Sequence, residues 1–217
     1  MWPFGNGKSA AAVTFGGFTD RHTHILPAVD DGVRSMEEAL EILRIYEAAG
    51  MAEVWCTPHI MEDIPNTTSA LRERFAELED AYTGGMRLHL ASENMLDNLF
   101  EERLAADDLL PLDDGRLLVE TSYFNPPMDL HDILIRIKQS GYTPVLAHPE
   151  RYIYMERREY AELKNMGIEF QLNVPSLSGL YGKHARQKAE WLRNRGLYDC
   201  MGTDVHNKYM VEKFLKK

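Results

Sequence analysis

From residue 18 onward, short apolar runs alternate with segments that have the period of amphipathic helices. In the third run, Met86, Leu88 and Leu90 alternate with polar or small neighbours, as expected for a strand that is buried on one face. Turn residues such as glycine and proline follow most of the runs. The runs predict seven strands, at 18–24, 53–57, 86–92, 116–120, 143–147, 169–173 and 198–202.

The segments between these runs predict helices. After the first strand, Ser35 and Glu38 have the spacing of a capping box. Four apolar residues follow at helical spacing, and Gly50 is placed to end the helix. Helices are predicted in this way at 35–49, 69–82, 97–106, 130–140, 160–166 and 185–195. We interpret residues 1–17 as a flexible leader and residues 18–217 as a single domain.

Strands that alternate with helices pair in parallel through right-handed crossovers, which leaves either an open sheet or a barrel. A polar residue stands at or just after the end of every predicted strand: His24, His59, Glu93, Glu120, His148, Asn173 and Asp204. An open sheet would spread these residues along one edge, whereas a barrel gathers them around one pocket. The pattern therefore predicts an α/β fold, a distorted seven-stranded (β/α) barrel similar to a TIM barrel.

Composition excludes several classes of function. The chain contains no run of 18 apolar residues, so we expect no membrane span. The formal net charge of −10 argues against a nucleic-acid-binding surface. Cys56 and Cys200 both fall in predicted strands, which indicates reduced thiols in a cytoplasmic protein. The negative charge does not exclude a phosphorylated substrate, because bound cations can invert the local field.

The polar strand ends belong to a larger group of candidate metal ligands. These are the histidines His22, His24, His59, His148 and His206 and the carboxylates Asp31, Glu93, Glu120 and Asp204. Any one of them, taken singly, is better explained as a cap or a packed side chain, but their joint occurrence at strand ends indicates a metal centre. Nine mixed nitrogen and oxygen ligands suit two or three ions of manganese, iron or zinc. Such multinuclear sites cleave phosphoesters.

The motifs around these residues resemble the polymerase and histidinol phosphatase (PHP) superfamily. They are Asp20-x-His22-x-His24, Asp30-Asp31-Gly32, Thr57-Pro58-His59, Glu93, Glu120, His148-Pro149-Glu150-Arg151-Tyr152 and Gly202-Thr203-Asp204-x-His206. Within that superfamily, residues 18–207 look like the manganese-dependent bacterial protein tyrosine phosphatases of capsule and exopolysaccharide gene clusters. The resemblance implies the PHP fold and a PHP-type phosphatase domain.

The resemblance also implies roles for individual residues. His22, His24, Glu93 and Asp204 would hold one ion. A second ion would be held by Asp31, His59 and His206. The third would be held by Glu93, Glu120 and His148. Arg151 matches the family's phosphate-binding arginine, and Lys208 stands where a second arginine is usual. Asn94 and Met95 replace the aromatic residues common after the glutamate, and a terminal helix is expected to be short or absent.

The implied function is a metal-dependent protein tyrosine phosphatase, in which metal-activated hydroxide hydrolyses phosphotyrosine on a bacterial tyrosine kinase of polysaccharide synthesis. Cysteine-dependent phosphatases need an arginine six residues after the cysteine, but Glu62 and His206 stand there, so neither thiol fits that motif. Two alternatives stay open. One is a small-molecule phosphomonoesterase similar to histidinol phosphatase, and the other is a non-catalytic metal-binding module that docks onto a kinase.

Overall fold

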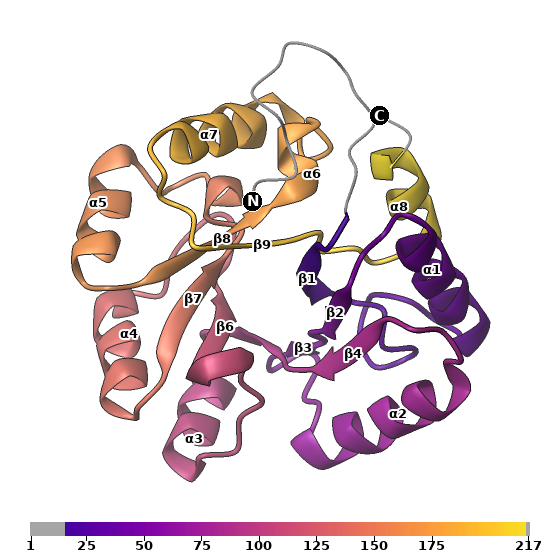
Figure 1. Ribbon diagram of the computed structural model, residues 1–217. Helices are drawn as coiled ribbons and strands as arrows, with labels where there is room; N and C mark the ends of the chain where they lie inside the picture. The colour runs from indigo at the N-terminus through magenta and orange to yellow at the C-terminus, as the bar shows by residue number, and fades with distance from the viewer. Residues whose placement is uncertain (1–15, 216–217) are drawn as a thin grey trace.

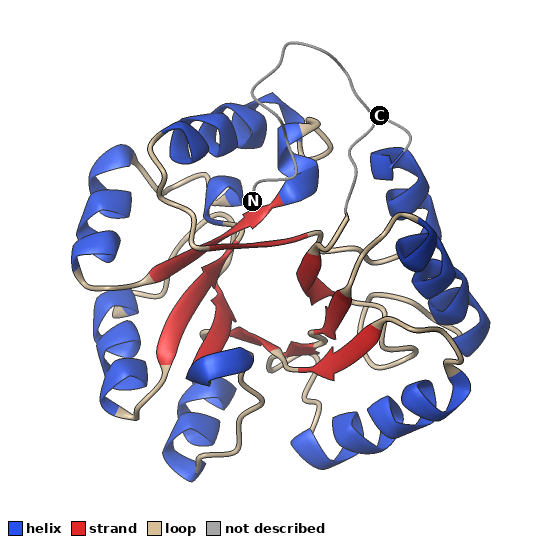
Figure 2. Ribbon diagram, in the orientation of Figure 1, coloured by secondary structure: helices blue, strands red, loops and turns tan. Residues whose placement is uncertain are grey.

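The computed structural model describes residues 16–215, so nearly all of the predicted leader lies outside the described residues. Helices lie outside the strands, which curl around the centre of the molecule (Figures 1 and 2). Among residues 16–215, no helix is both long enough and apolar enough to cross a membrane.

The strands pair in parallel and form two sheets. A three-stranded sheet has the order β1-β2-β4, and a curled six-stranded sheet has the order β3-β5-β6-β7-β8-β9. The bounds are β1 (Thr19–Thr23), β2 (Glu53–Cys56), β3 (His59–Ile60), β4 (Arg87–Leu90), β5 (Glu93–Met95), β6 (Arg116–Glu120), β7 (Thr143–Ala147), β8 (Glu169–Asn173) and β9 (Cys200–Gly202). The α/β class and the parallel pairing agree with the prediction.

The predicted count of seven strands is not confirmed, because two short strands, β3 and β5, lie just beyond the predicted strands 53–57 and 86–92. Thr57 and Pro58 separate β2 from β3, and Ala91 and Ser92 separate β4 from β5. Proline has no N–H group to donate within a sheet, which explains the first break. As a result, His59 and Glu93 each begin a short second strand, and the two residues are direct partners in the β3–β5 register.

The segment that follows β9 lies beside β1, near the beginning of the described chain. The Asp204 amide donates to the His22 carbonyl over 2.7 Å, and the His24 amide donates to the Val205 carbonyl over 2.9 Å. Gly202 at the end of β9 lies so close to His22 that an added Cβ would be 2.3 Å from the His22 Cβ. These contacts bring β1 and β9 together although they belong to different sheets.

The helices are close to their predicted positions. They are α1 (Met36–Ala48), α2 (Thr68–Ala81), α3 (Asn98–Ala106), α4 (Leu130–Gln139), α5 (Arg157–Asn165), α6 (Val174–Leu177), α7 (Gly182–Asn194) and α8 (Lys208–Leu215), with short 3-10 helices η1 (Asp113–Gly115) and η2 (Pro149–Arg151). The sequence pattern missed α6 and α8. The terminal helix, expected to be short or absent, is present with eight residues and lies beside α1 (Figure 1).

The cap of α1 differs from the predicted capping box. The Ser35 hydroxyl accepts the Glu38 amide over 3.2 Å, as predicted. The Glu38 carboxylate, however, accepts the backbone amide of Lys208 over 3.0 Å. Glu38 therefore joins the start of α8 to α1, because that carboxylate satisfies an amide that the first turn of α8 leaves without a partner.

Alternate residues of the central strands face opposite sides of the sheet. In β6, Leu117 and Val119 pack among the helices, whereas Leu118 belongs to a small cluster with Trp55 and Val145. Glu120 has the parity of Leu118 and lies at the end of the same strand. The apolar packing therefore fixes the register that places polar strand ends together.

We predict that Gly202→Ala destabilises the fold, because the new Cβ would lie 2.3 Å from the Cβ and 3.0 Å from the amide nitrogen of His22. Overpacking of this kind costs about 1–3 kcal/mol of unfolding free energy, which urea denaturation followed by circular dichroism would measure. Gly16→Ala is the control, since an added Cβ there meets nothing within 4 Å. Equal stability of the two variants would contradict the importance of this close approach.

Candidate metal centre

All nine predicted metal ligands gather at one place, around the carboxyl ends of the strands. Eight of them form three overlapping groups, and within each group the ligand atoms lie within 4.8 Å of one another. His148 is next to these groups, with its Nε2 3.0 Å from Glu93 Oε1. The gathering predicted from the strand ends is therefore present in the structure.

The first group contains His22, His24, Glu93 and Asp204. The two Nε2 atoms lie 3.1 Å apart, and each lies 3.1–3.4 Å from Glu93 Oε2 and Asp204 Oδ1. Four ligands about 2.0–2.1 Å from one ion would be about 3.3 Å apart in a tetrahedron. The spacing of these four atoms is thus that of a mononuclear coordination shell, and the group is the one implied by the resemblance.

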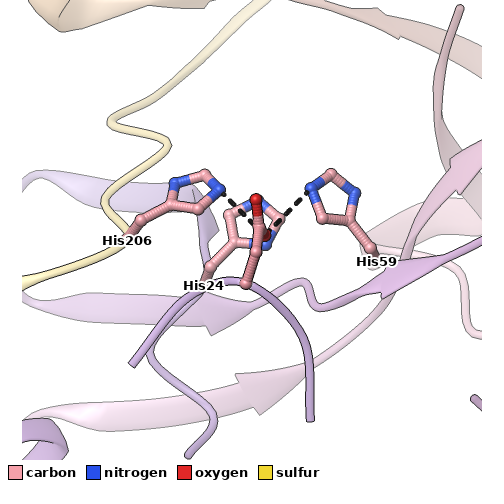
Figure 3. A group of neighbouring side chains, drawn as sticks. His24, His59 and His206 are labelled. Carbon is pink, nitrogen blue, oxygen red and sulfur yellow. Dashed lines mark ion pairs between the residues drawn. The ribbon is translucent and has the colours of Figure 1, made fainter. Parts of the chain in front are cut away.

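The second group contains His24, Asp31, His59 and His206. Asp31 Oδ1 lies 3.6 Å from His59 Nε2 and 3.4 Å from His206 Nε2. Figure 3 shows the imidazoles of His59 and His206 on opposite sides of His24. His24 is an addition to the ligand set implied by the resemblance, and it belongs to the first two groups.

The third group contains His59, Glu93 and Glu120. His59 Nδ1 lies 3.2 Å from Glu93 Oε2 and 3.0 Å from Glu120 Oε1. His148 Nε2 lies 3.0 Å from Glu93 Oε1 but 3.7 Å from Glu120 Oε2. His59 therefore stands between the second and third groups, with one ring nitrogen facing each. Glu93 belongs to the first and third groups and is the natural bridge between them.

Hydrogen bonds on the far ring nitrogens orient three of the imidazoles. His24 Nδ1 lies 2.8 Å from Asp30 Oδ2, and His22 Nδ1 lies 2.6 Å from Gln171 Oε1. His206 Nδ1 lies 2.9 Å from the Asp204 carbonyl. Such partners fix the tautomer that leaves Nε2 free as a ligand. Sequence reasoning missed this role of Gln171, although its parity in β8 matches that of Asn173 and was available as a signal.

The electrostatics of the buried groups favour a cation. Burial alone would raise the pKa of Glu93, but His22 and His59 outweigh it and hold the pKa well below its usual range. Burial alone would lower the pKa of His24, but Asp30 and Asp204 raise it well above its usual range. The carboxylates thus require positive charge beside them, and a divalent cation would supply it and displace the protons from the imidazoles.

Asp20, from the first motif, is not among the grouped side chains. It accepts the Thr203 amide over 2.9 Å and the Thr203 hydroxyl over 2.6 Å, and it also accepts the His22 amide over 3.2 Å. Burial raises the pKa of Asp20 to about 6 in spite of these hydrogen bonds. Asp20 therefore joins the two segments that carry His22 and Asp204.

The backbone at the site has unusual conformations. His148 and Asp204 have φ values of 34° and 53°, in the left-handed region that costs a non-glycine residue about 1–3 kcal/mol. Gly32 lies against the His24 carbonyl, where an added Cβ would be 2.2 Å from the oxygen. The surrounding structure holds these conformations, and they aim two candidate ligands at the centre.

Arg151, the predicted phosphate-binding residue, lies next to the first group. Its Nη1 donates to Asp204 Oδ2, the oxygen that faces away from the two imidazoles. The guanidinium carbon lies 4.4 Å from the centre of the Tyr123 ring and 4.2 Å from that of Tyr181, which is cation–π distance. These two rings supply aromatic walls that the sequence did not show at Asn94, whose buried amide instead donates to the Leu118 carbonyl over 2.9 Å.

Lys208, the other predicted phosphate ligand, is not brought to the same place. It begins α8, and its Nζ lies 2.8 Å from Glu41 Oε2 on α1. The acidic face of α1 attracts the ammonium group more directly than any candidate metal ligand does. The structure therefore gives Lys208 a contact between helices, which spacing along the sequence could not show.

The donor set fits divalent metal ions. Three side-chain atoms of the third group, His59 Nδ1, Glu93 Oε2 and Glu120 Oε1, are buried without a hydrogen bond. Buried polar atoms normally have partners, and their absence here calls for a specific explanation. Coordination to a cation explains all three, because each atom offers a lone pair to the same small volume.

Comparison with known proteins agrees with this geometry. The sequence family described as capsular polysaccharide synthesis, CpsB/CapC, matches residues 18–213. Tyrosine-protein phosphatase YwqE of Bacillus subtilis is 30% identical over 87% of this chain and 77% of its own length. Tyrosine-protein phosphatase CpsB of Streptococcus pneumoniae is 30% identical over 87% of this chain and 82% of its own length.

A solved structure shows the same fold. It comes from the crystal structures of YwqE from Bacillus subtilis and CpsB from Streptococcus pneumoniae, described as unique metal-dependent tyrosine phosphatases. That chain matches with a TM-score of 0.81 and 27% identity, over 90% of this chain and 87% of that one. On the matched residues and the shared fold, this chain belongs to the CpsB/CapC family of capsular polysaccharide synthesis.

Proposed function

We propose that this chain is a metal-dependent protein tyrosine phosphatase. The observation that carries the proposal is one carboxylate, Glu93, shared between two groups of candidate ligands, with the guanidinium of Arg151 attached to the first group through Asp204. Relatives named tyrosine-protein phosphatases support it. They also favour phosphotyrosine over a small molecule such as histidinol phosphate, and an enzyme over a non-catalytic module.

The nine gathered side chains would hold two or three divalent ions, and we propose manganese, with iron and zinc as alternatives. The first ion would be held by His22, His24, Glu93 and Asp204. The second would be held by Asp31 and His206, together with either His24 or His59. The third would be held by Glu93 and Glu120, together with either His148 or His59. When bound, such ions make hydroxide available near neutral pH and neutralise phosphate oxygens.

Arg151 would bind the phosphate group of the substrate. Its guanidinium lies at cation–π distance from the rings of both Tyr123 and Tyr181, which limits its movement. A planar guanidinium donates to two phosphate oxygens at once, so a guanidinium held in this place favours bidentate binding. In the transition state the same donors would stabilise the charge on the transferring oxygens.

Further parts of the proposal concern the whole chain. We propose that residues 18–217 form one domain, with β2–β3 and β4–β5 each counted as one interrupted strand of a distorted seven-stranded barrel. The family match over 18–213 and the contacts between β1 and β9 support this. We also propose a bacterial tyrosine kinase of polysaccharide synthesis as the substrate and a cytoplasmic location, for which the free thiols of Cys56 and Cys200 are consistent evidence.

Removal of divalent ions should abolish phosphatase activity, and manganese or a similar ion should restore it. The reloaded protein should also melt at a higher temperature, because ions bind the folded state and offset the repulsion between buried carboxylates. Elemental analysis, turnover of p-nitrophenyl phosphate and thermal unfolding would be measured on the same samples. Full activity in a preparation without metal would refute the proposal.

Arg151→Ala should lower kcat/KM for a phosphotyrosine peptide about tenfold to a thousandfold, the range for loss of one charge-stabilising donor. Metal content should stay unchanged, because Asp204 Oδ2 keeps the Asn173 amide at 3.0 Å while Oδ1 faces the imidazoles. Arg151→Lys should recover only part of the rate, since it lacks the planar fork. His148→Ala is the contrast and should lose metal as well as rate. Metal loss in Arg151→Ala would make Arg151 a structural residue.

The double variant Cys56→Ser with Cys200→Ser should keep most of its activity. Burial raises the pKa of both thiols, that of Cys200 to about 12, so neither forms the thiolate that a nucleophile needs near neutral pH. Some stability would be lost because a hydroxyl group replaces the buried thiol of Cys56. The variant's fold and metal content would be checked first. A folded, metal-loaded variant without turnover would show that a thiol takes part in the reaction.

A further inference from the structure

A groove of about 570 Å³ lies between α5 and α7, outside the metal centre. Its lining includes Ile153, Arg157, Arg158, Lys188 and Trp191. Figure 1 shows α5 and α7 as neighbours on the outer wall. The groove combines apolar surface with cationic side chains. One apolar side chain, that of Ile153, is 54% exposed, which is unusual for a large aliphatic residue beside a polar rim.

The groove is electropositive in an acidic protein. Residues 151–195 contain nine lysines and arginines against five acidic residues, whereas the whole chain has 24 against 34. Arg158 is paired with Glu162 over 2.7 Å within α5. Arg157 has no carboxylate within ion-pair distance among the described residues, and its guanidinium lies 5.3 Å from the centre of the Trp191 ring. Its charge is therefore available to a partner.

Among residues 16–215, one carboxylate lines the groove, and it is engaged locally. Glu156 forms a reciprocal capping box with Glu159 at the start of α5, so its oxygen accepts a backbone amide of that helix. Lys188 donates to the Tyr152 carbonyl and, over 2.7 Å, to the Met155 carbonyl. These hydrogen bonds hold the segment between η2 and α5 in place, which keeps the groove preformed.

This segment connects the groove to the proposed phosphate site. Ile153 is two residues after Arg151, and its amide donates to the Tyr123 carbonyl over 2.9 Å. The Tyr123 ring packs on the Arg151 guanidinium. An extended peptide rises about 3.3 Å per residue, so residues a few positions from a phosphotyrosine held at Arg151 would lie over the groove.

We propose that the groove between α5 and α7 docks the acidic residues that flank the phosphotyrosine of the protein substrate, with Arg157 as the main determinant. This inference rests on the proposed function and names a feature of its substrate. A chain with a net charge of −10 repels an acidic partner at a distance, so a local cationic surface decides where such a segment can bind. Exposed Ile153 would contact an apolar residue of the same segment.

The test compares two peptides of equal length, both with a non-hydrolysable phosphonate analogue of phosphotyrosine. Glutamates flank the analogue in one peptide and lysines in the other. Fluorescence anisotropy on metal-loaded protein should show tighter binding of the acidic peptide. Arg157→Glu should weaken that binding about threefold to tenfold, as expected for an exposed charge, and the preference should shrink at high salt.

The variant is expected to fold, because position 157 begins α5 and an acidic residue suits the first turn of a helix. Arg72→Glu on α2, across the molecule in Figure 1, is the matched control and should bind both peptides like the unaltered protein. Equal affinities for the two peptides, or equal effects of the two variants, would overturn the docking proposal. Turnover of p-nitrophenyl phosphate is measured in parallel. Its absence would refute the phosphatase proposal, whereas the peptide affinities would still test whether the groove docks acidic residues.

Discussion

The buried carboxylate of Glu93 is the group on which the centre depends. It lies within 3.2 Å of a ring nitrogen of each of four histidines, which come from or follow the three strands β1, β3 and β7: His22, His24, His59 and His148. A carboxylate without solvent contact is costly unless positive charge surrounds it. The same oxygens that attract cations would repel one another without a cation, so metal affinity and correct packing of the strand ends are linked.

Much of this centre could be predicted from the sequence, because parallel strands in a curled arrangement bring their carboxyl ends together and polar residues such as Glu120 and His148 stand there. Finer features depend on three-dimensional contacts. The direction in which each ring nitrogen of His59 points follows from neighbours far along the chain. The breaks after Cys56 and Leu90 follow from backbone pairing, and Lys208 is drawn to Glu41 on another helix. The pattern of residues along the sequence does not determine any of these contacts.

The proposed phosphate site and the proposed docking groove are adjacent because one segment, between β7 and α5, contributes to both. The segment from His148 to Met155 contributes a candidate ligand, the guanidinium of Arg151 and one wall of the groove. Lys188 and the tyrosine rings beside Arg151 hold this segment in place. A phosphate group is the same on every phosphoprotein, so discrimination between proteins has to come from surfaces beyond it. A preformed wall supplies that discrimination with little loss of entropy on binding.

The hydrogen bonds between Asp20 and Thr203 join residues 183 positions apart, and three of the four ligands of the first group, His22, His24 and Asp204, come from these same two segments. Closing so long a loop has an entropic cost that local contacts do not offset. We therefore expect the pairing of these two segments to occur late in folding. On a ribosome, where the chain emerges from its beginning, most helices and strands can form long before Asp204 appears. Until then the early histidines are exposed without their partners. The first group can therefore bind a metal ion with all four ligands only after the last strand has been synthesised.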